Sequence, residues 1–349
     1  MKYSDIAKSA VRNNYSIAVG MIPIDYKKIG RKALNILKMN NSRLSVIMHG
    51  NNHLKNEMLI SSTKQQKRKI LEQALWRMNH FSNKTGLKFS RAMVFPHDRG
   101  SIYTIRMMRK IGFQALFMQM SYPIDIKHEY KTINSLLEMF PSDNSVEGFP
   151  IINRHSMEAH YSDHNWQHKI LFHAWLGKPI IPWTHHYFFK YGLEEIEEKI
   201  DFINRHISPE WTNILEILNG NYTIANRKER VYINIYSNIL TIDVPDNVRE
   251  IILTKHGRNL PIKEETLIVN GTNHDWVYKS SDCLSTLINV YKQPIIRLEI
   301  IPNNAKLGGE KHLPDFRAYL RRYLTEFRDQ TETYFKWSDK FINAYVFTK

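Results

Sequence analysis

The first 220 residues alternate between short apolar runs and longer segments whose apolar residues recur at helical spacing. Strands are predicted at residues 15–24, 44–48, 88–95, 115–118, 149–152 and 179–183, and helices at 5–13, 27–39, 63–82, 102–111 and 193–206. A strand that leads into a helix and then into another strand is typical of βα units around a parallel sheet. The pattern therefore predicts an α/β domain, and ligands of such domains bind where the strands end.

The rhythm changes beyond Tyr222. Short alternating strands are predicted at 231–236, 239–244, 250–253, 266–269 and 295–301, and turn-forming residues such as Asn270-Gly271 separate them. A charged helix is predicted at 313–329. The pattern indicates two domains, an α/β domain at 1–222 and a smaller antiparallel β domain with a terminal helix at 223–349, with the boundary near 222–229.

Composition and charge limit the partners and the cellular compartment that we expect for this chain. The chain has 349 residues and a net charge of +15, but its basic residues are scattered, and the dense run at 64–69 lies on a predicted helix. We therefore expect no nucleic-acid partner. Cys283 is the single cysteine, which excludes an internal disulfide framework. No apolar stretch is long enough to cross a bilayer and the first residues do not resemble a secretion signal, so we expect a cytoplasmic protein without a membrane span. The sequence leaves the oligomeric state open.

Histidines follow three of the predicted strands. His49 ends the strand at 44–48 and His53 lies four residues further on, His97 follows the strand at 88–95, and the pair at 185 and 186 follows the strand at 179–183. Two histidines at this spacing can face one point if the chain turns helically between them. Neutral imidazole is a common ligand of zinc and similar metals. The histidines therefore predict a metal or acid–base site at this edge of the sheet.

Two histidines leave a metal short of protein ligands, and a carboxylate is expected to complete the set. Asp25 and Asp98 are the candidates in the chain, and Glu57 could orient a ligand or add an oxygen. Each aspartate has an alternative role, because Asp25, Asp98 or Ser101 could instead cap the helix that follows it. Nucleophilic-serine and phosphate-loop chemistry is not indicated, since neither glycine-rich motif occurs.

The turn His49-Gly50-Asn51-Asn52-His53, the Phe95-Pro96-His97 turn and the trailing histidine pair together resemble the polysaccharide deacetylase family of carbohydrate esterases. The resemblance covers roughly residues 1 to 220 and implies a deformed (β/α) barrel that removes acetyl groups from N-acetylated sugars or glycoconjugates. It implies one divalent metal, zinc or else cobalt, manganese or nickel. The implied roles are metal binding by His49 and His53, catalysis by His185, His186 and Asp98, and substrate binding by His97, Arg154 and Trp183.

One departure limits the resemblance. The family opens with a strand that ends in an Asp-Asp pair, a base and a metal ligand, whereas this chain contains no Asp-Asp and begins with what reads as the following helix. We expect that this strand either precedes Met1 or has been lost, and that deacetylase activity is impaired in this chain. The alternative is a non-catalytic carbohydrate-binding or scaffold protein on the same fold, with Trp183, Tyr187 and Trp211 as sugar-stacking side chains.

Overall fold

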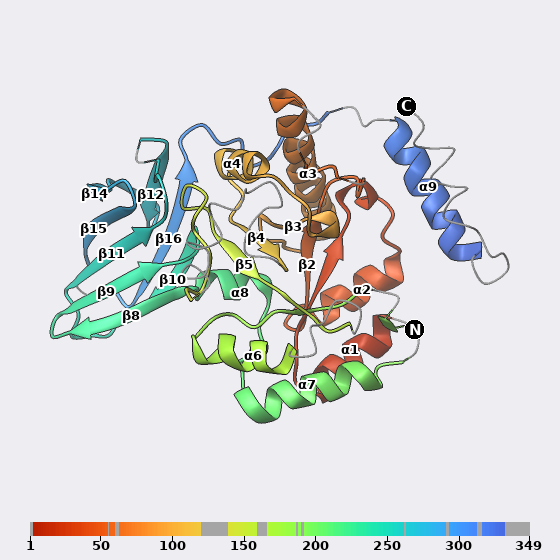
Figure 1. Cartoon of the computed structure of the whole chain (residues 1–349), viewed down its shortest axis with the longest axis horizontal. Helices are drawn as coiled ribbons and strands as arrows, with labels where there is room; N and C mark the ends of the chain where they lie inside the picture. Colours follow the sequence, from red (N-terminus) through yellow and green to blue (C-terminus); the bar gives the residue numbers. More distant parts are fainter. Residues whose placement is uncertain are drawn as a thin grey trace.

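The computed structural model describes residues 3–54, 56–59, 63–119, 139–158, 166–185, 188–189, 192–261, 263–290, 293–312 and 316–331. It has a parallel sheet flanked by helices and a neighbouring region of antiparallel sheets (Figure 1). The predicted mixed α/β class, with a parallel sheet followed by an antiparallel β region, is confirmed. None of the helices in the described ranges is long and apolar enough to span a bilayer.

The parallel sheet follows the order of the sequence. Its strands are β1 (Ile17–Met21), β2 (Leu44–His49), β3 (Ala92–Val94), β4 (Ala115–Met118) and β5 (Ile151–Asn153). A further parallel pair, β6 (His155–Ser156) and β7 (Pro182–Trp183), continues from the end of β5. Between the described strands no hydrogen bonds close this wall into a barrel.

Burial of both faces holds this sheet together. Met48, Met93 and Leu116 face one cluster of buried residues, and Ala92 and Phe117 face another. The helices of this region and the two 3-10 turns are α1 (Tyr3–Arg12), η1 (Pro23–Asp25), α2 (Arg31–Met39), α3 (Lys64–Thr85), η2 (Pro96–Asp98), α4 (Ile102–Ile111), α6 (Trp166–Trp175), α7 (Glu194–Ile207) and α8 (Ile214–Asn219). Short strands buried on both sides read as continuous apolar runs, which is why they were visible in the sequence.

The antiparallel region contains two sheets. One has the order β10-β16-β12-β13 and the other the order β14-β15-β11-β9-β8. Their strands are β8 (Tyr222–Arg227), β9 (Arg230–Ile235), β10 (Ile239–Asp243), β11 (Glu250–His256), β12 (Glu265–Val269), β13 (Thr272–His274), β14 (Val277–Ser280), β15 (Cys283–Asn289) and β16 (Ile295–Pro302). The β9–β11 pair is parallel, unlike the other pairs of these two sheets.

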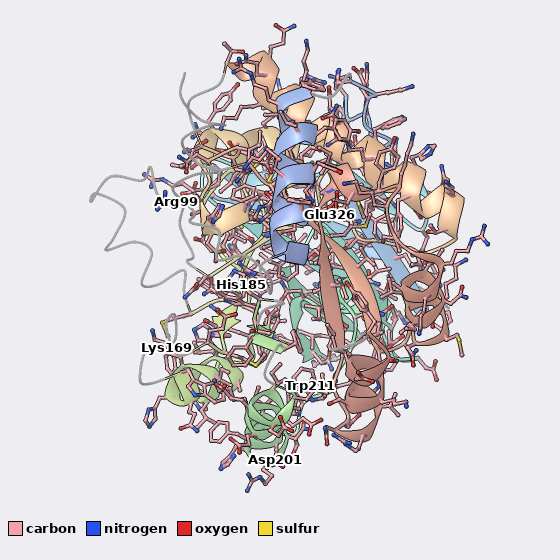
Figure 2. All side chains as sticks on the ribbon, turned by 90° about the vertical axis from the view of Figure 1, so that its right-hand side faces the viewer. Arg99, Lys169, His185, Asp201, Trp211 and Glu326 are labelled. Atoms are coloured by element: carbon pink, nitrogen blue, oxygen red, sulfur yellow. The ribbon has the colours of Figure 1, made fainter. Side chains whose placement is uncertain are left out.

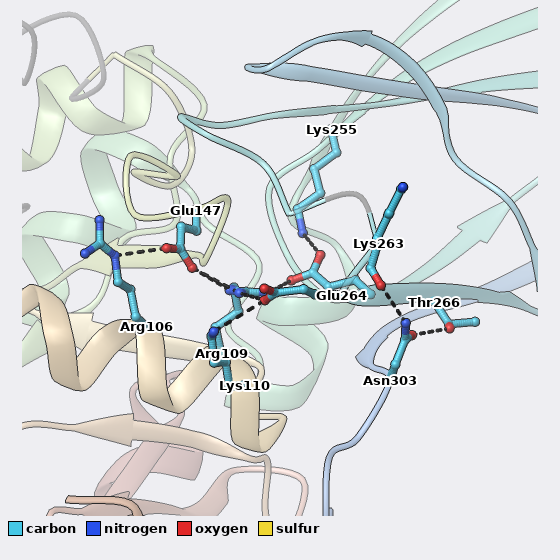
Figure 3. A network of polar contacts seen from close by, with 10 residues as sticks. Arg106, Arg109, Lys110, Glu147, Lys255, Lys263, Glu264, Thr266 and Asn303 are labelled. Atoms are coloured by element: carbon cyan, nitrogen blue, oxygen red, sulfur yellow. Dashed lines mark hydrogen bonds and ion pairs between the residues drawn. The ribbon is translucent and has the colours of Figure 1, made fainter. Parts of the chain in front are cut away.

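An ion-pair network and the last described helix connect the parallel-sheet region with later parts of the chain. Arg109 of α4 forms ion pairs with Glu147, Glu264 and Glu265, and Lys255 of β11 also pairs with Glu265 (Figure 3). The last described helix, α9 (Phe316–Thr331), lies beside the parallel sheet (Figures 1 and 2), and its Arg322 donates to Asp25 at 2.6 Å. The division of the chain at residue 222 stays a prediction, but α9 contacts the region before that boundary.

Candidate metal centre

The predicted histidine pair lies at the carboxyl end of β2. His49 is the last residue of the strand, Gly50 turns the chain with a φ of 63°, and His53 follows with a φ of 57°. The two Nε2 atoms lie 3.1 Å apart. Two nitrogens bound to one tetrahedral zinc ion at the usual bond length would lie about 3.3 Å apart. The 3.1 Å spacing is that of a hydrogen bond between the two imidazoles, and it also suits two ligands of a single ion.

Buried polar groups hold this turn in place. The Glu57 carboxylate accepts hydrogen bonds from the backbone N–H groups of Asn51, Asn52 and His53 at 2.8, 3.0 and 3.1 Å. Arg77 of α3 donates to the side-chain oxygens of Asn51 and Asn52 at 2.6 and 2.8 Å. Of the two roles considered for Glu57, the structure shows its oxygens bonded to the backbone of the turn. It thereby orients the turn that carries His53.

Gly50 is required by this arrangement for two reasons. Its positive φ is one that a residue with a Cβ adopts only with strain. A Cβ placed here would also lie 2.2 Å from Glu57 Oε1 and 2.5 Å from a ring carbon of Pro96. The close approach of the Glu57 carboxylate to the turn therefore depends on glycine.

The environment keeps both imidazoles neutral. The pKa of His49 is lowered to about 3, mainly by burial and also by the neighbouring His53 and Arg154. The pKa of His53 falls to about 4 through burial, with contributions from His97 and Arg321. Neutral imidazole is the form that coordinates a metal. The pair is therefore ready to bind an ion at neutral pH without first losing protons.

The second strand end brings in His97, Asp98 and Arg154. His97 and Asp98 have φ values of 57° and 51°, a conformation that is strained for both residues. The His97 ring lies 5.3 Å from that of His53, measured between ring centroids. Asp98 accepts a hydrogen bond from Arg154 Nη2 at 2.7 Å. Ser101, not Asp98, caps α4, since its hydroxyl accepts from the Thr104 N–H at 3.1 Å.

The third strand end presents His185 next to a buried acid. His185 Nδ1 lies 3.0 Å from each oxygen of Glu158, whose side chain is 2% exposed. This contact fixes the ring and directs Nε2 away from Glu158, as in other histidines that are oriented by a carboxylate. Ring and ion-pair contacts link the three strand ends in turn, since His53 contacts His97, Asp98 binds Arg154, and Trp183 contacts both Arg154 and His185. His186 and Tyr187 lie outside the described residues.

Trp183 lies within this group, although its ring is already engaged. The Arg154 guanidinium lies over it at 4.7 Å from the ring centroid, and the His185 ring meets it edge-on at 5.0 Å. Trp211 packs against Tyr15 in a buried cluster, with ring centroids 6.2 Å apart. The tryptophans therefore support the polar side chains and the core in this conformation.

No third ligand joins His49 and His53 within the described ranges. Asp25 is engaged by Arg322, and Asp98 by Arg154. One set of three potential ligands with atoms within 4.8 Å of one another does occur in the described part of the chain, and it consists of Glu72, Glu310 and His312. Glu72 already pairs with Arg68, and Glu310 with Lys306, so protein cations compensate both carboxylates.

Sequence reasoning did not find Glu158. It follows the two-residue strand β6, a segment too short to give a periodic signal, and it has no motif partner nearby in the sequence. The one feature that could have indicated Glu158 is its position just after β6, because His185 follows β7 and the two strands pair. A scan against protein-family models gives no match, and no similar sequence is found among curated proteins.

Proposed function

We propose that this chain is a metal-dependent hydrolase resembling polysaccharide deacetylases, built on a deformed, incompletely closed (β/α) barrel and acting on N-acetylated carbohydrates. One observation carries the proposal, namely the convergence of the His49 and His53 Nε2 atoms at 3.1 Å. His185 follows β7 of the neighbouring two-stranded sheet and is oriented by the buried Glu158. A metal-binding pair next to an oriented proton donor is suited to amide hydrolysis.

Each residue of the site then has a distinct task. His49 and His53 would hold a divalent metal, zinc or a close equivalent, and the metal would supply polarisation of the amide carbonyl and acidification of a water molecule. His185, oriented through Nδ1 by Glu158, carries the proton for the departing amine on Nε2. Arg154 and His97 supply hydrogen-bond donors toward the sugar. Asp98 positions Arg154 through their ion pair.

Metal uptake tests the ligand assignment directly. The purified protein is loaded with zinc or cobalt and its bound metal is measured by mass spectrometry. The variant His49→Ala is expected to lose the metal. His206→Ala is the matched control, because His206 lies on α7 and is exposed to solvent. Equal metal content in the wild-type protein and His49→Ala would overturn the assignment.

Acetate release from N-acetylated oligosaccharides tests the reaction. The metal-loaded protein is expected to release acetate, and His185→Asn is expected to reduce the rate by about a hundredfold, as for loss of a general acid. Unchanged metal content in His185→Asn would separate this effect from loss of the ion. Metal binding without acetate release would refute the catalytic part alone.

A second candidate is a protein that binds N-acetylated carbohydrate without turnover. A specific observation favours it, because no carboxylate of the described residues lies with His49 and His53 in a three-ligand set. Such a site would bind metal weakly and would lack the base of the Asp-Asp motif. Oligosaccharide binding measured by calorimetry, without acetate release under zinc or cobalt, would favour this candidate.

A further inference from the structure

The two faces of α9 differ sharply in what they contact. The inner face packs on the protein, with Ala318 buried, Arg321 Nη1 donating to the His53 carbonyl at 2.7 Å and Arg322 donating to Asp25. The outer face exposes Phe316, Leu320 and Tyr323, which are 76%, 42% and 65% exposed. These three side chains, the α9 stripe, are spaced four and three residues apart and so lie along one side of the helix.

Exposed cations lie beside this helix. Lys27, Lys28, Arg31 and Lys32 form a basic segment between η1 and the first turn of α2, and all four are exposed. Lys28 Nζ pairs with Glu326 Oε2 of α9 at 2.9 Å, so the segment adjoins the C-terminal half of the helix. Figure 2 shows α9 across the face of the molecule turned toward the viewer, with Glu326 labelled on it.

We propose that the α9 stripe and the basic segment together form a docking surface for an anionic lipid bilayer. An interfacial helix binds by burying an apolar side at the boundary between headgroups and acyl chains while neighbouring cations attract anionic headgroups. Both components occur here on adjacent elements, and the net charge of +15 favours approach to a negative surface. The helix lies in the interface plane and does not cross the membrane.

Charge and side-chain type favour an anionic bilayer over two other partners, a second copy of the chain and a polyanion. A second copy of the chain would bring the same cations against one another, which costs free energy. A polyanion such as RNA would be attracted by the basic segment and would stack bases on Phe316 and Tyr323, but the aliphatic Leu320 offers it no stacking face. An anionic bilayer is complementary to both parts of the surface. Because Arg321 touches His53 from the inner face of the same helix, docking would place the histidine pair near the membrane surface.

Vesicle flotation of the full chain tests the proposal. Vesicles of phosphatidylcholine and phosphatidylglycerol in equal amounts are compared with vesicles of phosphatidylcholine alone. We expect the chain to float with the anionic vesicles, and the stripe variant Phe316→Ser/Leu320→Ser/Tyr323→Ser to bind them about tenfold more weakly or worse. The matched control is Ile224→Ser/Val277→Ser/Leu287→Ser, which removes three exposed apolar side chains from the β region. Circular dichroism confirms that each variant is folded.

Each outcome is decisive. Flotation that is lost in the stripe variant, kept in the control and weakened in Lys27→Gln/Lys28→Gln/Arg31→Gln/Lys32→Gln supports the proposal. Absence of flotation by the wild-type chain overturns it, as does binding that depends on the four cations but survives loss of the stripe, which would indicate a polyanion surface. A dimer in light scattering that the stripe variant dissociates, together with no vesicle binding, would assign the stripe to a second copy and also overturn the proposal.

Discussion

The buried charges that join α4 to the β region allow a test in which a second substitution offsets the first. Glu265 and Lys255 are each 2% exposed in their side chains and form an ion pair at 2.8 Å. Glu265 also pairs with Arg109 at 3.0 Å, whereas Arg109 has further partners in Glu147 and Glu264 (Figure 3). Glu265→Gln is nearly isosteric but removes the negative charge that the lysine faces.

The expected magnitude follows from what each variant leaves unpaired. Breaking a buried pair by removing one partner costs about 3–5 kcal/mol, because an uncompensated charge stays in the interior. Glu265→Gln leaves Lys255 in this position and should lower the free energy of unfolding by that amount. Lys255→Met should cost less, about 1–2 kcal/mol, since Arg109 still compensates Glu265. In the double variant no buried lysine is left without a counter-charge, so it should be more stable than Glu265→Gln alone by about 1–3 kcal/mol.

Urea unfolding followed by tryptophan fluorescence and by far-ultraviolet circular dichroism measures these differences. Coincident transitions for the two probes are required before free energies are compared. A double variant whose loss equals the sum of the two single losses would refute the reasoning, because it would show that the two charges are not coupled. A loss below about 1 kcal/mol in Glu265→Gln would show that the lysine finds water or another partner.

Three further predictions concern the site and its surroundings. Glu158→Gln should slow acetate release about tenfold to a hundredfold with unchanged metal content, because the orientation of His185 is weakened; equal rates would refute this role. Gly50→Ala should lower the free energy of unfolding by about 2 kcal/mol or more, owing to its positive φ and the contact with Glu57; a calorimetric scan checks it. Burial lowers the pKa of His155 to about 3, so its contribution to stability is fully present above pH 6.5 and is lost as pH falls toward 3. At pH 5 the unfolded chain binds a proton at His155 and the folded chain does not, which lowers the free energy of unfolding by about 2 kcal/mol. His155→Gln should reduce the difference in free energy of unfolding between pH 7 and pH 5, measured with urea, by that amount. An unchanged difference would refute this.

The parallel half of the fold was predictable because its strands are buried on both faces. The helix at 102–111 and the strand at 115–118 were predicted with the bounds that the structure shows. The strand predicted at 88–95 is shorter, Ala92–Val94, because its first residues do not pair with the neighbouring strands. Continuous apolar runs therefore predicted where each strand is, and at 15–24 and 88–95 they overestimated how far the strand extends.

The strands of the antiparallel region were harder to predict from the sequence. Residues 222–229, where the boundary was predicted, form β8 and the turn after it, an edge strand with mostly exposed side chains and therefore no apolar alternation. The strands β13 and β14 were missed for the same reason, since most of their side chains are exposed, whereas β15 was missed although most of its side chains are at least partly buried. Pairing with a partner strand stabilises such segments, and that information lies elsewhere in the chain.

The residues of the candidate site differ in the same way, because some contacts are set by nearby sequence and others by residues far along the chain. The spacing of His49 and His53 is encoded within five residues, and the structure places their nitrogens together. The partners that hold the site come from distant parts of the chain, as Arg321 does when it donates to the His53 carbonyl across 268 positions. A single sequence carries no signal for such a pairing. Glu158 and His185 are closer, 27 positions apart, but their contact depends on two short strands that lie side by side.

Backbone strain and buried charge occur together around the histidine pair. His53, His97 and Asp98 have positive φ angles that cost about 1–3 kcal/mol each, so the surrounding contacts must offset several kilocalories per mole. The carboxylate of Glu57, whose pKa is raised by burial, bonds three N–H groups of the turn, and the Arg154–Asp98 pair holds the next loop. Positive φ angles also occur at seven other non-glycine residues of the described ranges, Asn14 and Ser208 among them, so strain supports the proposed metal site only together with the placement of the two Nε2 atoms.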